Sequence, residues 1–199
     1  METPASVLAF WFGSEISDGA VAQAQSALWW QKNPATDDAI RARFAGWTAQ
    51  AASGALDAWR ATPQGLLALI VLTDQFPRNM YRGTPQSFAF DALALGWCRE
   101  GLARGADRQL RPIERVFFYL PLEHSEVLAD QQQAVQNMGA LAAAVPADQR
   151  APFEGFADYA RRHQAVIARF GRFPHRNAIL GRSSTPQERE FLQQPGSSF

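Results

Sequence analysis

The sequence predicts an all-α protein, and three observations support this fold class. Several prolines follow a residue that caps helices well, an order typical of helix starts. Apolar residues recur at spacings of three and four, and no segment alternates as a half-buried strand does. We therefore expect one helical domain over residues 1–199, with 1–3 and 194–199 frayed. The cap and proline pairs are Asn33 and Pro34, Thr62 and Pro63, Thr84 and Pro85, and Thr185 and Pro186.

The N-terminal part of the chain predicts three helices. Pro4 starts a short apolar helix that Gly13 ends, and a second short helix is expected near Val21. A longer helix begins at Pro34. Its apolar residues recur at i, i+4, i+7 and i+11, which places them on one face. They are Ile40, Phe44, Trp47 and Ala51.

The helix that begins at Pro63 is apolar on every side, so we expect it in the centre of the fold. Asp74 lies at its C-terminal end, where the helix dipole disfavours a carboxylate unless a cation such as Arg78 is close. The residue before Pro77 is biased away from helical geometry. We therefore expect residues 76–79 to form a turn or a break.

The second half of the chain predicts four more helices. One begins at Pro85 and is closed by glycines 101 and 105, and Pro121 interrupts an apolar segment that starts at Pro112. The last short helix begins with a capping box at Thr185. The remaining two helices are expected at 123–145 and 149–170.

Composition and charge limit the partners of this chain. The formal net charge is zero, which argues against a protein that coats nucleic acid or an anionic membrane. No apolar run approaches the roughly 20 residues of a membrane helix, and the N-terminus lacks the features of a signal peptide. The single Cys98 cannot form an internal disulfide. We expect a cytoplasmic protein without nucleic-acid or membrane partners.

One stretch of the chain, Arg169 to Arg182, is basic and contains no acidic residue. Its sequence FPHRNAILGRSSTP, from Phe173, parallels FPRNMYRGTP, from Phe76. Loops at helix ends bring guanidinium groups and free backbone N–H groups together, an arrangement that suits a carboxylate or phosphate ligand. The sequence therefore predicts a site between the two motifs for a small anionic or polar molecule. Its expected ligand-binding residues are Asp74, Arg78, Arg82, Glu123, His124, Gln131, His163, Arg169, Arg172, His175, Arg176 and Arg182.

Histidines supply the candidate catalytic residues, His124 and His163. His124 and Gln131, seven residues apart, fall in the apolar arc of the predicted 123–145 helix, and His163 falls in the apolar face of the next helix. A neutral histidine buried near a carboxylate can act as a general acid or base near pH 7. The alternative is a hydrogen-bonded histidine in the core.

An internal ion network is the alternative to an anion-binding pocket. Acidic residues elsewhere in the chain are numerous enough to pair with most of these arginines. They include Asp74, Asp91, Glu123, Glu126 and Asp130.

The sequence contains no pattern for a metal or a cofactor, so none is expected. Glu123 to Glu126 reads EHSE, but adjacent residues on a helix diverge by about 100° and no second histidine follows at i+4. Gly171 and Gly181 are too far apart for a phosphate-binding loop. Ser125 lacks the context of a nucleophile elbow, which disfavours a serine hydrolase.

Several long motifs occur in this chain in one order: TDQFPRNMYRG, PLEHSEVLADQ, RFGRFPHRNAILGR and STPQE. In these motifs, over nearly its whole length, the sequence resembles domain of unknown function family 924, a mostly bacterial family. The resemblance implies a fold similar to tetratricopeptide-like (TPR-like) proteins, with antiparallel helix pairs stacked in a curved, right-handed superhelix. It leaves the activity open.

Two functions follow as hypotheses. The first is a protein that binds a small anionic or polar molecule, with acid–base catalysis by His124 or His163. The second is a non-enzymatic module that holds a protein or peptide segment in the concave groove between stacked helix pairs. In the second, the Arg/His cluster is a structural ion network.

Overall fold

The computed structural model describes residues 1–198, which form helices and connecting segments and no strand. The all-helical class is confirmed, whereas the right-handed superhelix stays a prediction. The longer helices are α4 (Pro34–Ala52), α5 (Pro63–Ile70), α7 (Asp91–Ala103), α8 (Pro112–Glu123), α9 (Leu128–Ala144) and α10 (Arg150–Phe170). The shorter ones are α1 (Pro4–Phe12), α2 (Asp18–Ala24), α3 (Ser26–Trp30), α6 (Phe76–Met80) and α11 (Pro186–Phe191).

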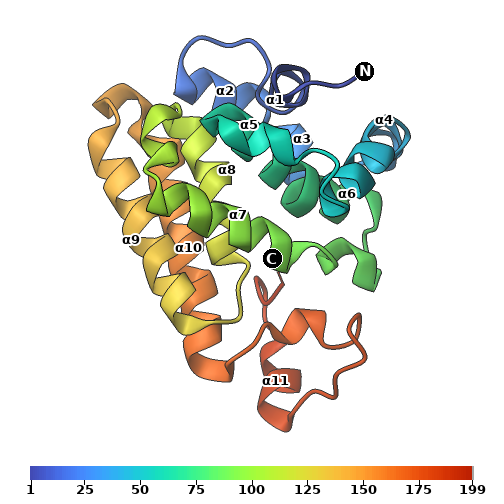
Figure 1. The fold of residues 1–199 in the computed structure, drawn as a ribbon. Coiled ribbons are helices and arrows are strands. Elements are labelled where there is room, and N and C mark those ends of the chain that lie inside the picture. The colour runs from blue at the N-terminus through green and yellow to red at the C-terminus, as the bar shows by residue number, and fades with distance from the viewer. Residues whose placement is uncertain (199) are drawn as a thin grey trace.

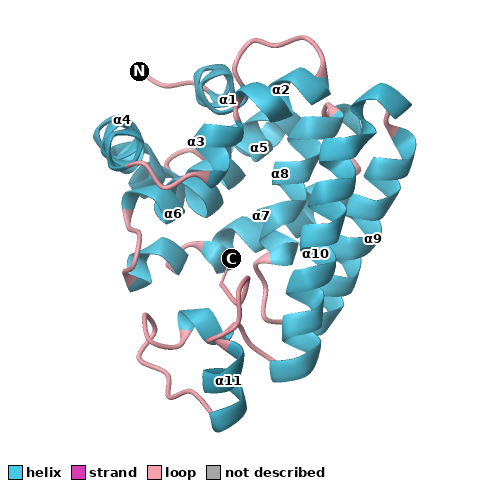
Figure 2. Cartoon of the chain, turned by 180° about the vertical axis from the view of Figure 1, so that it is seen from behind, coloured by secondary structure: helices cyan, strands magenta, loops and turns pink. Residues whose placement is uncertain are grey.

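The helices enclose α5, as its all-apolar sequence predicts. Every residue from Leu66 to Leu72 is fully buried, and α5 packs against α1, α7 and α8. The long antiparallel pair α9 and α10 forms one side of the molecule, and α4 and α6 lie on the opposite side (Figure 1). The segment with α11 lies at one end, next to the lower ends of α9 and α10 (Figure 2). The fold therefore brings the C-terminal loop next to the start of α7 and the turn after α8.

Most helix starts follow the local signals in the sequence. Thr62 accepts a hydrogen bond from the backbone of Gly65, and Asn33 caps α4 in the same way. Thr185 and Glu188 form the predicted capping box of α11. Side-chain caps satisfy N–H groups that have no partner within the helix. Sequence-local chemistry thus fixes these boundaries.

The predicted break at 76–79 is wrong, because the chain stays helical from α5 through α6. A π-turn, Val71–Gln75, joins them, and the N–H of Phe76 donates to the carbonyl of Val71, five residues earlier. The wider turn shifts the hydrogen-bond register, so Pro77, which lacks an N–H, follows without breaking the helix. Asp74 lies inside this π-turn.

The prediction of one helix over 123–145 is also wrong. Helix α8 continues through Pro121, and α9 begins only at Leu128. His124 is the C-cap of α8, and its N–H donates to the carbonyl of Leu120. His124 and Gln131 therefore share no helix face. Similarly, a 3₁₀ turn occupies Pro85–Phe88, and α7 starts after it at Asp91.

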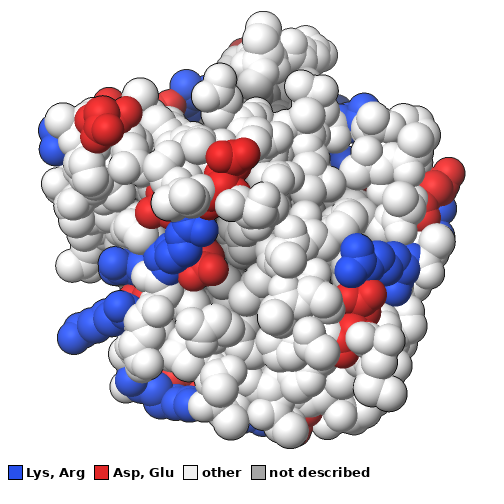
Figure 3. All heavy atoms as spheres, turned by 90° about the horizontal axis from the view of Figure 1, so that it is seen from above, with Lys and Arg blue, Asp and Glu red and all other residues white. Residues whose placement is uncertain are grey.

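Charged side chains on the surface are mixed in sign. Figure 3 shows small groups in which basic and acidic side chains lie next to one another. Among the described residues, no helix combines the length and apolar character needed to cross a bilayer. The fraying expected at both termini stays a prediction, and Phe199 lies outside the described residues. Thr3 caps α1, and Ser197 is buried.

Two glycines of α7 provide a test of how tightly the central helices pack. A Cβ atom at Gly101 would lie 2.3 Å from Phe118 and 2.7 Å from Leu66, whereas one at Gly96 would meet no heavy atom within 4 Å. We expect Gly101→Ala to lower the free energy of unfolding by about 1–3 kcal/mol through overpacking. The control Gly96→Ala should raise it by roughly 0.5–1 kcal/mol, since alanine favours helix. Urea unfolding measures both, and equal effects would contradict this packing.

Candidate functional site

The two parallel motifs meet at Asp91, the first residue of α7. Arg78, from the first motif, binds both oxygens of the Asp91 carboxylate at 2.8 and 3.0 Å. Arg176, from the second motif, lies 3.4 Å from Oδ2 of the same carboxylate. The helix N-terminus favours the negative charge of Asp91. Residues far apart in the sequence thus form one cluster, as the parallel between the motifs predicts.

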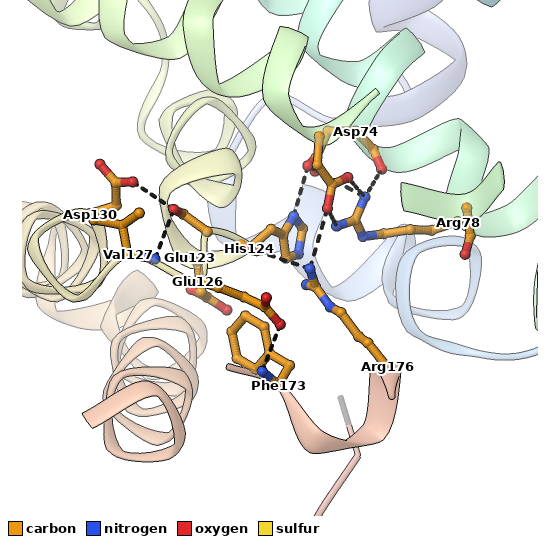
Figure 4. Close-up of polar contacts among 12 residues, drawn as sticks. Asp74, Arg78, Glu123, His124, Glu126, Val127, Asp130, Phe173 and Arg176 are labelled. Carbon is orange, nitrogen blue, oxygen red and sulfur yellow. Dashed lines mark hydrogen bonds and ion pairs between the residues drawn. The ribbon is translucent and has the colours of Figure 1, made fainter. Parts of the chain in front are cut away.

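Asp74 and His124 form the centre of this cluster. Nδ1 of His124 lies 2.8 Å from Oδ1 of Asp74, whose side chain is fully buried. Nε2 of Gln75 donates to the other oxygen of Asp74 at 2.5 Å. Arg78 donates to the Asp74 carbonyl at 2.6 Å, and Arg176 to the His124 carbonyl at 3.1 Å. Figure 4 shows His124 between Asp74 and Arg176.

The electrostatic surroundings set the protonation of this pair. Burial alone would raise the pKa of Asp74, but His124 and Arg78 outweigh burial and lower it to about 2. Burial and the charge of Arg78 lower the pKa of His124, although Asp74 acts in the opposite direction. His124 is therefore neutral at pH 7 and donates its Nδ1–H to the Asp74 carboxylate. This tautomer leaves a lone pair on Nε2.

Glu123 and His163 form a second pair of an acid and a histidine, close to the pair of Asp74 and His124. Nδ1 of His163 donates to the Tyr159 carbonyl at 2.9 Å and lies 3.2 Å from Oε1 of Glu123. Burial and the nearby charge of Asp74 raise the pKa of Glu123 to about 8. Burial lowers the pKa of His163 to about 3. Both groups are thus uncharged at pH 7, which avoids a further charge in the core.

All three histidines of the chain belong to this region. The rings of His124 and His163 are 6.4 Å apart, and Phe173 contacts the rings of both His163 and His175. Burial and the charge of Arg176 lower the pKa of His175 to about 4. The three histidines therefore lie close together, an arrangement that the sequence left open.

Four of the predicted ligand-binding arginines have partners outside the centre of the cluster. Arg82 pairs with Asp37 at 2.6 Å and Arg172 with Glu188 at 2.6 Å. Arg182 pairs with Glu126 at 2.7 Å. Arg169 lies over the rings of Phe170 and Phe191. Arg82, Arg172 and Arg182 thus have the geometry of the ion-network alternative, whereas Arg169 makes cation–π contacts.

Gln131 also has a local partner rather than a place beside His124. Its Nε2 donates to the carbonyls of Glu123 and Ser125 at 2.5 and 2.6 Å. These carbonyls belong to the turn between α8 and α9, whose backbone groups need partners once the helix has ended. Gln131 thus holds the turn that presents His124.

The sequence reasoning missed three residues of the cluster as site residues: Gln75, Phe88 and Asp91. Phe88 contacts both arginines of the cluster, and its ring centroid lies 5.6 Å from Cζ of Arg78 and 4.7 Å from Cζ of Arg176. The sequence suggests Asp91 only as one possible partner in an ion network. Its position at a helix start could have been found only with the correct start of α7, which the 3₁₀ turn before it obscures.

The fold and the cluster together define a class: an all-helical protein that holds a buried Asp–His pair where two FPxRN-like motifs meet. A family model described as bacterial protein of unknown function (DUF924) matches residues 7–196, so this chain belongs to that family. It is similar to the solved structure of a protein of unknown function from Agrobacterium tumefaciens. The two share 36% identity, 96% of each chain is covered, and the TM-score is 0.81. A comparison with curated proteins gave no match.

The raised pKa of Glu123 predicts a stability that depends on pH. The folded protein holds the proton up to about pH 8, whereas an ordinary glutamate loses it near 4.5. The free energy of unfolding should therefore fall between these pH values, by about 1.4 kcal/mol for each pH unit. In Glu123→Gln this contribution is absent. The free energy of unfolding of the variant should therefore increase relative to that of the wild type as pH rises.

Urea unfolding of both proteins from about pH 5 to about pH 9 measures this difference. Glu154→Gln is the matched control, because Glu154 is exposed on α10, and its profile should follow that of the wild type. Parallel profiles for Glu123→Gln and the wild type would show that the Glu123 carboxyl is ionised in the folded protein at neutral pH.

Proposed function

We propose that this protein binds a small polar molecule beside His124 and that His124 acts on it as a general base. The observation that carries the proposal is the 2.8 Å contact between His124 and the fully buried Asp74. A carboxylate in this position fixes the imidazole tautomer and stabilises the imidazolium that forms when the base takes a proton. Asp74 would thus orient the base, and His124 would move the proton.

The surroundings of Nε2 support His124 as the base in preference to His163. None of the described residues hydrogen-bonds Nε2 of His124, and its side chain keeps 13% of its exposure. His163 keeps only 4%. A substrate hydroxyl or a water molecule at Nε2 would lose its proton to a base whose other nitrogen is already held. Glu123, the neighbour of His124 in the chain, is protonated at pH 7 and is an acid of the cluster that could return a proton.

The backbone around the pair is held from two sides. Arg78 binds the carbonyl of Asp74, Arg176 binds that of His124, and Asp91 contacts both arginines. Asp74 also lies in a π-turn, a feature frequent at functional sites. Perturbed pKa values that cluster with such geometry favour a functional site.

The ion pairs of the C-terminal loop favour the second function, a non-enzymatic TPR-like module for a protein or peptide segment. Arg172 and Arg182 are held by Glu188 and Glu126, as a structural network requires. A stoichiometric protein partner in a pull-down, together with an unreactive His124, would support this function over the first.

Diethyl pyrocarbonate, which acylates neutral imidazole nitrogens, tests the exposed lone pair directly. We expect His124 to react before His163 in the folded protein at pH 7, because Nε2 of His124 lacks a partner among the described residues. Asp74→Asn should slow the reaction, since an amide can donate to Nδ1 and so favour the Nε2–H tautomer. Peptide mass spectrometry locates the modified residue. Protection of His124 until the protein unfolds would contradict the proposal.

Turnover is the second test. Once a screen of small polar substrates yields an activity, His124→Gln should lower kcat by roughly 10²- to 10⁴-fold, the usual contribution of a general base. His163→Gln, measured in the same assay, separates a base from a supporting core residue. An activity that His124→Gln leaves intact would assign the chemistry to another residue.

A further inference from the structure

Arg176 differs from Arg43, Arg82 and Arg172 in how its hydrogen-bonding groups are used. In Arg43, Arg82 and Arg172, Nε and Nη2 together bind the two oxygens of one carboxylate. This side-on fork is a geometry that guanidinium and carboxylate groups share. Nε of Arg176 is buried without a hydrogen-bond partner, and none of the described residues accepts from its Nη2. The same fork in Arg176 is therefore unpartnered.

The rest of the Arg176 guanidinium has contacts, so only the edge formed by Nε and Nη2 is left without an acceptor. The guanidinium lies over the rings of Phe88 and Phe173, whose centroids are 4.7 and 4.4 Å from Cζ. Its other edge, Nη1, contacts the His124 carbonyl and Asp91. Asp91 is 3.4 Å away and already binds Arg78 at 2.8 and 3.0 Å. Asp91 therefore satisfies Arg176 only in part.

A buried, unsatisfied group of this kind is unfavourable without a partner. The side chain of Arg176 keeps 8% of its exposure, and burial lowers its pKa to about 10. A buried donor without an acceptor destabilises the folded protein, and it does so more strongly when it is charged. The two rings offset part of this cost through cation–π contact, but they accept no hydrogen bond in the plane of the guanidinium. An oxygen pair placed at the fork would satisfy it.

The geometry points to a small oxyanion as the ligand of this site, bound side-on by Nε and Nη2 of Arg176 next to His124. This inference rests on the proposed function in that both use one site. The two charged carboxylates, Asp74 and Asp91, already balance Arg78 and Arg176 while the histidines are neutral. A single added negative charge is therefore more easily accommodated than two, and a proton taken up by His124 would compensate it. A carboxylate and a monoanionic phosphate share this chemistry.

The Nε–H resonance of Arg176 in ¹⁵N NMR spectra of the full-length protein tests the inference without any mutation. Sodium formate, sodium acetate and inorganic phosphate are titrated separately, which distinguishes a carboxylate ligand from a phosphate. We expect the Arg176 signal to shift saturably with at least one of them. No saturable shift with any of the three would overturn the inference.

Variants separate this inference from the proposed function. Arg176→Lys keeps the charge but cannot form the fork, so binding of the same anion should weaken by about tenfold or more. Arg43→Lys, whose fork lies on Glu2, is the matched control and should bind as the wild type does. His124→Gln should still bind the anion. Equal affinity in Arg176→Lys and the wild type would overturn the inference.

The two outcomes are distinguishable. Anion binding at Arg176 with an unreactive His124 would keep the ligand class and remove the base. A reactive His124 with an unshifted Arg176 Nε–H signal would remove the oxyanion and keep the base.

Discussion

The structure depends on one electrostatic constraint, which is the negative charge of Asp74 inside the core. Its side chain is fully buried and its pKa is lowered to about 2, so the charge is present at neutral pH. Burying an ion costs several kcal/mol unless its oxygens are paired and hydrogen-bonded. Gln75, His124 and Arg78 supply those contacts. The elements that carry these residues are therefore fixed relative to one another.

The constraint extends outward from Asp74 to the C-terminal third of the chain. Arg78 needs Asp91 at the start of α7, and Asp91 attracts Arg176 from the loop after α10. Glu126 then holds this loop, because it accepts from the Phe173 N–H and pairs with Arg182. A loop of this kind would otherwise be mobile. The ion pairs in the loop that look purely structural thus position the residues around His124.

Local signals predicted much of the fold, since caps such as Thr62 and Thr185 act on N–H groups two or three residues away. The π-turn was not predictable in this way. It contains no cap or proline signal of its own, and its wider hydrogen bond, from Phe76 to Val71, lets Pro77 follow without a break. The start of α9 was misplaced because the apolar spacing continued through residues 124–127, where the chain turns.

The sequence indicates the residue types of the candidate site but not their arrangement. Unusual residue types identified His124, His163 and the arginines of both motifs. The sequence does not show which arginine has no carboxylate at its Nε and Nη2 groups, because this depends on distances between segments that are remote in sequence. Arg172 and Arg176 look alike in the sequence, yet only Arg172 has a carboxylate at its fork.

Asp74 and its surroundings hold His124 neutral, with the proton on Nδ1 and a lone pair on Nε2. Long-range ¹H–¹⁵N NMR of the histidine side chains measures this tautomer directly in the folded protein. At pH 7 we expect a protonated Nδ1 and an unprotonated Nε2 for His124. A doubly protonated ring, or a proton on Nε2 in place of Nδ1, would contradict the account.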